Sequence, residues 1–281
     1  AAFSTISTIN VSSNPKLDRN VLIKLYDSTN GATWTNKTDW NGAVGSECDW
    51  YGVTCTSGQI TTLSLGSNNL SGTIPTELGN LTSLIQLNFF NNSLTGTIPA
   101  ELGNLTNLTY LGLAGNQLSG SIPTELGNLT SLNYLRLYIN ALTGSIPSEL
   151  GELTNLIELS LGHNQLTGSI PSALGSLSNL TVLNLYDNQL SGSIPSELGS
   201  LSNLTSLNLS TNSLTGPLPQ WLSDMAISTL NVTDAFTSAP VVAISGGNRT
   251  IEDSDGIAGK PVSFTGTATD SDGTIATTQW L

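Results

Sequence analysis

The chain has 281 residues, of which 20 are Asp or Glu and 7 are Lys or Arg, so its formal net charge at pH 7 is −13. This acidic balance argues against binding to nucleic acid or to an anionic membrane surface. No apolar run approaches the roughly 20 residues that a membrane-spanning helix needs, so we expect no membrane insertion. The length predicts one elongated domain and a small second one.

The N-terminal segment, residues 1–59, has the features of an extracellular protein. The chain opens without an initiator methionine, as expected after removal of a signal peptide. An Asn-Pro pair at residues 14–15 predicts the start of a helix, and the apolar residues that follow keep helical spacing. A disulfide between the only two cysteines, Cys48 and Cys55, would close a loop of eight residues and add about 2.5 kcal/mol. Such a disulfide favours an oxidising, extracellular or cell-surface location.

Residues 60–226 contain seven copies of one 24-residue repeat, referred to below as the phrase, and the last copy is one residue short. The phrase reads LxxLxLxxNxLxGxIPxxLgxLxx, and a fixed period of this length predicts a solenoid. Its Leu-x-x-Leu-x-Leu part alternates as a short strand does, so stacked copies predict a parallel sheet with rungs about 4.8 Å apart. The asparagine of each copy can satisfy backbone groups where the chain leaves the strand, which indicates a structural role.

The LxGxIP segment after LxxLxLxxN resembles plant-type leucine-rich repeats. Residues 30–55, NGATWTNKTDWNGAVGSECDWYGVTC, resemble the N-terminal cap of that family. The resemblance implies a helix and a Cys-bridged hairpin over the first coil, with Trp34, Trp40 and Trp50 as packing residues. The expected fold class is therefore an α/β solenoid, a leucine-rich repeat coil with a parallel concave sheet and a helical cap. The family includes receptor ectodomains and inhibitors of cell-wall-degrading enzymes, which implies binding as the class of function.

The sequence changes character after the last repeat. Residues 227–239 begin an eighth strand without an LxGxIP segment, and we expect them to form the C-terminal cap and linker. Residues 240–281 resemble the opening strands of a PKD-like or related immunoglobulin-like sandwich, a fold that needs about 100 residues. We expect these strands to belong to a truncated domain or to pair with the coil or another chain. Their Asp-rich loops offer oxygen ligands to calcium, or are simple Asp-Gly turns; the candidate ligands are Asp253, Asp255, Asp270 and Asp272.

The outward strand positions are mostly small or polar, but those of the middle repeats carry aromatic and charged side chains. Aromatic residues with one arginine in a polar field are typical of an interaction hot spot. The alternative is that exposed tyrosines simply suit a strand surface. We favour a concave site for an extracellular protein, peptide or glycan, as in a secreted or cell-surface recognition or adhesion module. The candidate residues are Phe90, Tyr110, Tyr134, Arg136, Tyr138, Glu158, His163, Tyr186 and Asp187.

Ser160, His163 and Asp187 have the residue types of a nucleophile, a base and an orienting acid. An open sheet has no pocket to exclude water or to position an oxyanion donor, so we expect no enzyme. One histidine with two scattered carboxylates also makes a poor metal site. We therefore expect no cofactor in the coil.

A second face suggests an alternative function. The residues flanking the LxGxI glycine are Ser or Thr in every full repeat, which predicts two hydroxyl ranks about 6.8 Å apart that repeat about every 4.8 Å. This lattice resembles the ice-contacting surfaces of solenoid antifreeze proteins, although Ser and Thr are also ordinary at these positions in the plant-type family. Ice binding is thus the alternative. Its candidate residues are Thr73, Thr95, Thr97, Ser119, Ser121, Thr143, Ser145, Thr167 and Ser169.

Overall fold

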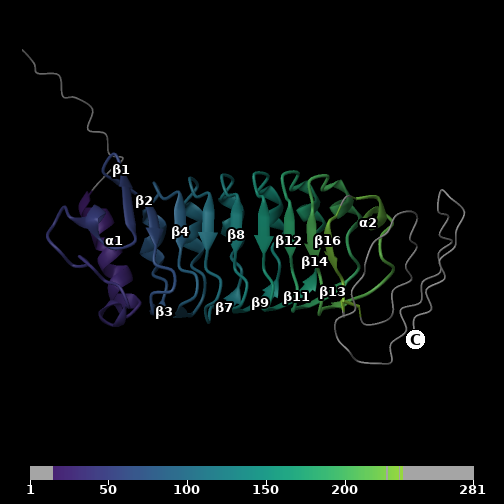
Figure 1. The fold of residues 1–281 in the computed structure, drawn as a ribbon, viewed down its shortest axis with the longest axis horizontal. Helices are drawn as coiled ribbons and strands as arrows, with labels where there is room; N and C mark the ends of the chain where they lie inside the picture. Colours follow the sequence, from purple (N-terminus) through teal and green to yellow (C-terminus); the bar gives the residue numbers. More distant parts are fainter. Residues whose placement is uncertain (1–14, 226, 234, 237–281) are drawn as a thin grey trace, which may run out of the picture.

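A computed structural model of the chain describes residues 15–225, 227–233 and 235–236, which form one elongated coil (Figure 1). Most repeats make one turn of the coil, with a strand, a second strand and a short 3-10 helix in succession. The predicted α/β solenoid with a parallel sheet is confirmed. In the described residues, no helix is long and apolar enough to cross a membrane.

The strands from the LxxLxLxx segments build the main sheet. Within the described residues it has nine strands, in the order β1-β2-β4-β6-β8-β10-β12-β14-β16. Strand β1 pairs antiparallel with β2, and the later pairs are parallel, with equivalent residues of successive repeats opposite each other, as in Leu87 beside Leu111. The bounds are β1 (Val53–Thr56), β2 (Gln59–Ser64), β4 (Gln86–Asn88), β6 (Tyr110–Gly112), β8 (Tyr134–Arg136), β10 (Glu158–Ser160), β12 (Val182–Asn184), β14 (Ser206–Asn208) and β16 (Thr229–Asn231).

The LxGxI segments form a second set of short strands on another side of the coil. In the described residues they make a two-stranded sheet, β3-β5, and a five-stranded sheet, β15-β13-β11-β9-β7. An isolated bridge between Thr97 and Ser119 links the two. The bounds are β3 (Ser71–Thr73), β5 (Ser93–Thr95), β7 (Ser119–Ser121), β9 (Ala141–Ser145), β11 (Gln165–Ser169), β13 (Gln189–Gly192) and β15 (Ser213–Leu214).

Short 3-10 helices follow the proline of each IP pair on the third side. The conformation of proline suits the residue just before a helical turn, since its φ is fixed near −65°. Helix α2 (Trp221–Asp224) takes this place in the last copy, where the phrase is degraded. The bounds of the others are η3 (Thr76–Asn80), η4 (Ala100–Asn104), η5 (Thr124–Asn128), η6 (Ser148–Glu152), η7 (Ser172–Ser176) and η8 (Ser196–Ser200).

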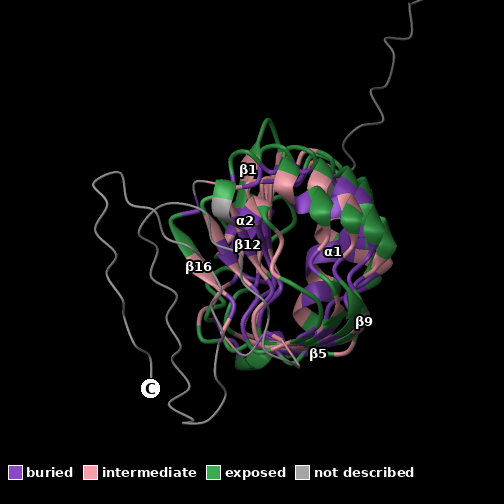
Figure 2. Cartoon of the chain, turned by 90° about the vertical axis from the view of Figure 1, so that its right-hand side faces the viewer, coloured by how far each residue is buried: buried purple, intermediate pink, exposed green. Residues whose placement is uncertain are grey.

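The interior is filled by the leucines of the LxxLxLxx segments and by the IP isoleucines, which are buried in successive coils. Seen along the coil, buried residues line the inside and exposed ones the outside (Figure 2). The repeated asparagine ties neighbouring coils together, as Asn164 shows. Its Nδ2 donates to the Leu137 and Leu161 carbonyls at 3.1 and 3.0 Å, and its Oδ1 accepts from the Leu142 N–H at 3.0 Å. The structural role predicted for this position is confirmed.

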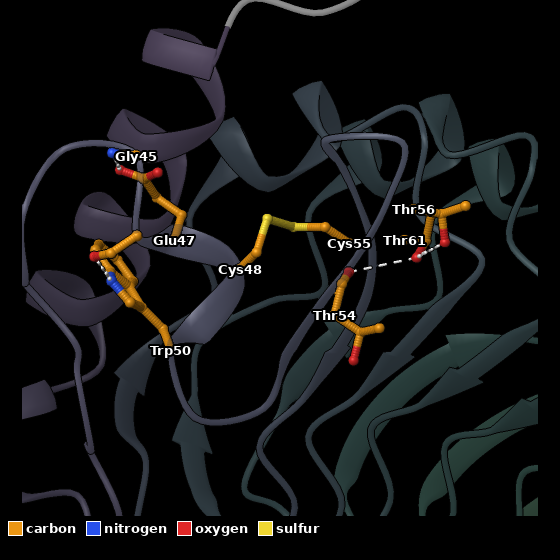
Figure 3. The surroundings of a disulfide bond; sticks show 9 residues. Gly45, Glu47, Cys48, Trp50, Thr54, Cys55, Thr56 and Thr61 are labelled. Carbon is orange, nitrogen blue, oxygen red and sulfur yellow. Dashed lines mark hydrogen bonds between the residues drawn. A yellow bond between two sulfur atoms is a disulfide. The ribbon is translucent and has the colours of Figure 1, made fainter.

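The cap covers the first coil with helix α1 (Pro15–Ser28) and the 3-10 helices η1 (Gly31–Thr33) and η2 (Glu47–Asp49). Three tryptophans pack there: Trp34, Trp40 and Trp50 are buried, with rings of successive pairs 4.7 and 5.0 Å apart. The Cys48–Cys55 disulfide is formed, joining η2 to β1 (Figure 3). The Cys-bridged cap implied by the resemblance is therefore present.

Strand β16 is the eighth strand expected after the last repeat, and Ile227 and Val232 beside it are buried. Several expectations fall outside the described residues. These are the processed N-terminus, the sandwich-like segment at 240–281, its pairing with another chain, and its calcium candidates Asp253, Asp255, Asp270 and Asp272.

Candidate functional site

The outward face of the main sheet, which we call the concave face, carries a charged cluster at its centre, which we define as Tyr110, Tyr134, Arg136 and Glu158. Strands β6, β8 and β10 are neighbours, and their register sets Tyr110 beside Tyr134 and Tyr134 beside Glu158. Arg136 donates from Nε and Nη2 to the two oxygens of Glu158, at 2.9 and 2.5 Å. Its guanidinium also lies 5.5 and 5.4 Å from the ring centroids of Tyr110 and Tyr134. The two-pronged contact with a carboxylate is the strong geometry for arginine.

The charges of this cluster are satisfied within the protein. The hydrogen bond with Glu158 is the main reason that the pKa of Arg136 lies above its usual value, while partial burial acts in the opposite direction. Ser160 donates to Glu158 Oε1 at 2.8 Å and is itself buried. The nucleophile, base and acid that could be drawn from the sequence are thus not assembled, because Ser160 is bonded to Glu158 and not to His163.

A column of alternating large and small residues runs beside the charged cluster. It reads Phe90, Ala114, Tyr138, Gly162 and Tyr186 in five successive repeats. The Phe90 and Tyr138 rings lie two rungs apart, about 9.6 Å along the sheet, yet their centroids are 6.4 Å apart. They therefore lean toward each other over Ala114, which is buried. A Cβ on Gly162 would lie 2.1 Å from the Tyr186 ring, so this ring covers Gly162.

Phe90, Tyr138 and Ile139 form what we call the apolar patch. Phe90 and Ile139 are among the large hydrophobic residues with substantial exposure, at 39% and 43%. Ile139 has φ 55°, a left-handed conformation that is a genuine outlier for a β-branched residue. The equivalent positions in neighbouring repeats are Gly115 and His163, and they too have positive φ. The backbone of the coil therefore imposes this conformation, and an exposed isoleucine that is strained in it points to a function.

His163 and Asp187 occupy the left-handed turn position after β10 and β12, with φ 53° and 51°. His163 Nδ1 and Asp187 Oδ2 are hydrogen-bonded at the edge of the concave sheet, and both side chains are substantially exposed. The His163 ring stacks at 6.4 Å on Tyr186. Burial, with the nearby Asp187 and Tyr138, raises the pKa of Tyr186 above its usual value. The nine candidates thus lie on one face, but in separate pairs and clusters.

Two asparagines beside the aromatic column offer amide donors. Asn184 Oδ1 accepts from the backbone N–H of Tyr186 at 3.3 Å, and Asn208 Oδ1 accepts from that of Ser210 at 3.1 Å. These bonds hold the Oδ1 atom of each asparagine against the backbone. In the described part of the chain neither Nδ2 donates to a protein group, so both amide nitrogens can donate to a ligand. Sequence reasoning did not single out these residues. The signal is the recurrence of Asn two positions before the column of aromatic and small residues.

The hydroxyl ranks are skewed, which differs from the rectangular lattice predicted. Strand register sets Ser121 beside Thr143 and Ser145 beside Thr167, so the second rank of one repeat lies beside the first rank of the next. Thr95 donates to a carbonyl of the preceding coil at 3.1 Å. The face is bordered by an open groove of about 820 Å³, lined by hydroxyls, Ile-Pro pairs and carboxylates of the first three repeats.

A leucine-rich repeat family model matches residues 59–235, well over half of the chain. This chain is a leucine-rich repeat protein. It is 45% identical over 51 residues to the leucine-rich repeat receptor protein kinase EMS1 of Arabidopsis thaliana, covering 18% of this chain and 4% of that relative. The leucine-rich repeat chain thus spans a small part of this curated relative. In the part of it that the structure describes, no group of three His, Cys, Asp or Glu side chains could hold a metal ion.

Solved structures show the same coil. The PEPR1–AtPEP1 crystal structure has a TM-score of 0.71 at 33% identity and covers 81% of this chain and 34% of that one. The Arabidopsis receptor kinase HAESA, solved with the peptide hormone IDA and the co-receptor SERK1, has a TM-score of 0.58 at 34% identity and covers 74% and 40%. A plant ice-binding protein has a TM-score of 0.58 at 25% identity and covers 83% and 89%.

Proposed function

We propose that this leucine-rich repeat protein is an extracellular or cell-surface recognition module that binds an extended peptide or protein segment along its concave face. The observation that carries the proposal is the preorganised surface on that face. Arg136 is held by Glu158 and two tyrosine rings, so the centre of the sheet needs little ordering when a ligand arrives. The apolar patch beside it leaves hydrophobic surface exposed, as hot spots do.

Two further observations support the proposal. HAESA, a leucine-rich repeat relative of similar fold, was solved with a peptide hormone. The Cys48–Cys55 disulfide is typical of proteins in oxidising, extracellular surroundings. Adhesion to a glycan would use the same concave face, and the experiment below separates the two kinds of ligand.

The test is binding of the purified protein to a randomised peptide library and to an array of neutral and acidic oligosaccharides. We expect peptide binding that Tyr138→Ala abolishes. Tyr51→Ala is the matched control, since it removes a tyrosine that is 39% exposed on the cap. Equal binding by both variants would contradict the concave site, and binding to oligosaccharides alone would replace the peptide with a glycan.

Ice binding is the second candidate, supported by the hydroxyl ranks on the LxGxI face and by the fold shared with a plant ice-binding protein. Partition of the protein into a slowly growing ice hemisphere tests it, with an inert protein as reference. Strong incorporation that Thr97→Tyr and Ser145→Tyr abolish, and that Tyr138→Ala leaves unchanged, would assign the function to the hydroxyl ranks. Exclusion from the ice would eliminate this candidate.

A further inference from the structure

The concave face contains few charges that a ligand could pair with. Its acidic and basic side chains in the described residues are Arg136, Glu158, His163 and Asp187, and each is paired with another of the four. A ligand charge placed here would have to break a pair that is already formed. The overall charge of −13 adds repulsion for an acidic ligand. The face is therefore suited to an uncharged stretch of ligand.

The apolar patch supplies the attraction for such a stretch. The Phe90 and Tyr138 rings close over Ala114 and remain partly exposed to solvent, and the exposed Ile139 follows Tyr138 directly in the chain. An apolar side chain that packs there removes hydrophobic surface from water on both partners. The left-handed φ of Ile139 indicates that its exposed side chain is kept at some cost in strain.

The amide donors of Asn184 and Asn208 lie further along the same face. They belong to the sixth and seventh repeats, whereas Tyr138 and Ile139 belong to the fourth. Tyr138 of the patch and Asn184 are separated by two rungs of about 4.8 Å each, about 9.6 Å in total. This distance equals the length of about three extended residues. Free amide N–H groups at this distance match backbone carbonyls of a peptide laid along the coil.

We infer that the ligand is a peptide segment without charged side chains, which seats one large apolar residue on Phe90, Tyr138 and Ile139. Its backbone carbonyls, beginning about three residues from this anchor, accept from Asn184 and Asn208. The inference rests on the proposed function and adds to it the chemistry of the ligand. The Arg136–Glu158 pair then positions the tyrosines and excludes ligand charge, and does not itself form an ion pair with the ligand.

The experiment is a display selection of random ten-residue peptides on the whole protein, followed by affinity measurements on one selected peptide. We expect one position to be restricted to Leu, Ile, Met, Phe or Trp, with no charged residue within three positions. Replacement of this anchor by Ala is expected to weaken binding tenfold or more, about the loss of one buried apolar side chain. Asn184→Ala in the protein is expected to weaken binding about threefold to tenfold, the range for one hydrogen bond.

The outcomes separate this inference from the proposed function. Selected peptides that share a charged motif, or that bind equally well to Phe90→Ala protein, would overturn the inference and leave peptide recognition standing. A selection that yields no peptide would overturn both. Thr211→Asn is the matched control for protein variants, because it changes a left-handed turn residue of the last repeat, away from the apolar patch.

Discussion

Replacement of Ile139 by asparagine should separate stability from recognition. Asparagine adopts the left-handed conformation far more readily than a β-branched residue does. The relief of strain at φ 55° is worth about 1–2 kcal/mol. Against this stands the loss of apolar contacts: burying an isoleucine completely is worth about 1.5–3 kcal/mol, and Ile139 is 43% exposed, so the loss is about 1 kcal/mol. We therefore expect Ile139→Asn to leave the free energy of unfolding unchanged or slightly higher.

The same Ile139→Asn substitution should weaken peptide binding. Loss of the isoleucine from the apolar patch is expected to weaken the affinity for a selected peptide about tenfold, which corresponds to 1.4 kcal/mol. Urea denaturation measures the stability, and titration calorimetry measures the affinity. Thr211→Asn relieves strain at the same position of another repeat, where φ is 52°, and should raise stability by about 1 kcal/mol without changing affinity. A loss of stability above about 2 kcal/mol with unchanged binding would show that Ile139 is a packing residue.

Three further predictions concern the groups that fix the coil. Arg136→Ala leaves the shielded Glu158 carboxylate unpaired and should lower stability by about 1–3 kcal/mol, whereas Glu158→Gln with Arg136→Met should recover most of that loss in urea denaturation. Asn164→Ala removes the acceptor of the buried Leu142 N–H, while the Leu137 and Leu161 carbonyls keep bonds from Asn140 and Asn188. A cost of about 1–3 kcal/mol is therefore expected, and a cost below about 0.5 kcal/mol would contradict the role of the asparagine ladder. Glu47 is desolvated by burial, yet its bonds to Arg19 and to backbone N–H groups outweigh this effect and lower its pKa below the ordinary 4.5. The ionised Glu47 carboxylate thus stabilises the folded protein above pH 4.5, and this contribution is lost as the pH falls through the lowered pKa. Glu47→Gln should therefore reduce the difference in the free energy of unfolding between neutral and acidic pH.

The coil was predictable from the sequence because its determinants are local and repeated. Leucines at fixed positions define the inward side of each strand, and the asparagine of each copy satisfies the backbone at the same turn. The cap was predictable for a different reason, since the spacing of Trp34, Trp40, Cys48 and Cys55 carries a family resemblance. Both features depend on residues within one or two coils.

The candidate site was predictable only as a set of residues. Arg136 was expected only as one residue of the candidate site, and the structure pairs it with Glu158, 22 positions further along the chain. That pairing depends on side chains reaching diagonally between the neighbouring strands β8 and β10, which the repeat phrase does not specify. The strain at Ile139 could be noticed in the sequence: four of the six other copies carry Gly, Asn, Asp or Ser at this turn, one carries His and one carries Thr, whereas isoleucine, like that threonine, is β-branched and tolerates positive φ poorly.

The skew of the hydroxyl ranks was beyond sequence reasoning for a third reason. Equivalent residues face each other in the main sheet, but in the second sheet Ser145 lies beside Thr167, which is 22 residues further on, and not beside Ser169 at the full period of 24. The offset depends on the path that each coil takes from one side to the next. A single repeat does not contain this information.

The constant rung spacing makes the coil a molecular ruler. The apolar patch and the two amide donors lie on different repeats. The fifth repeat lies between them, and its strand β10 pairs in register with β8 on one side and with β12 on the other. Duplication of one 24-residue unit between them would move the two subsites apart by one rung, about 4.8 Å, without altering either. Deletion of one unit would bring them together by the same step. With the peptide binding proposed above, tandem copying of the gene segment is a route by which such proteins can change the length of the ligand while keeping its chemistry.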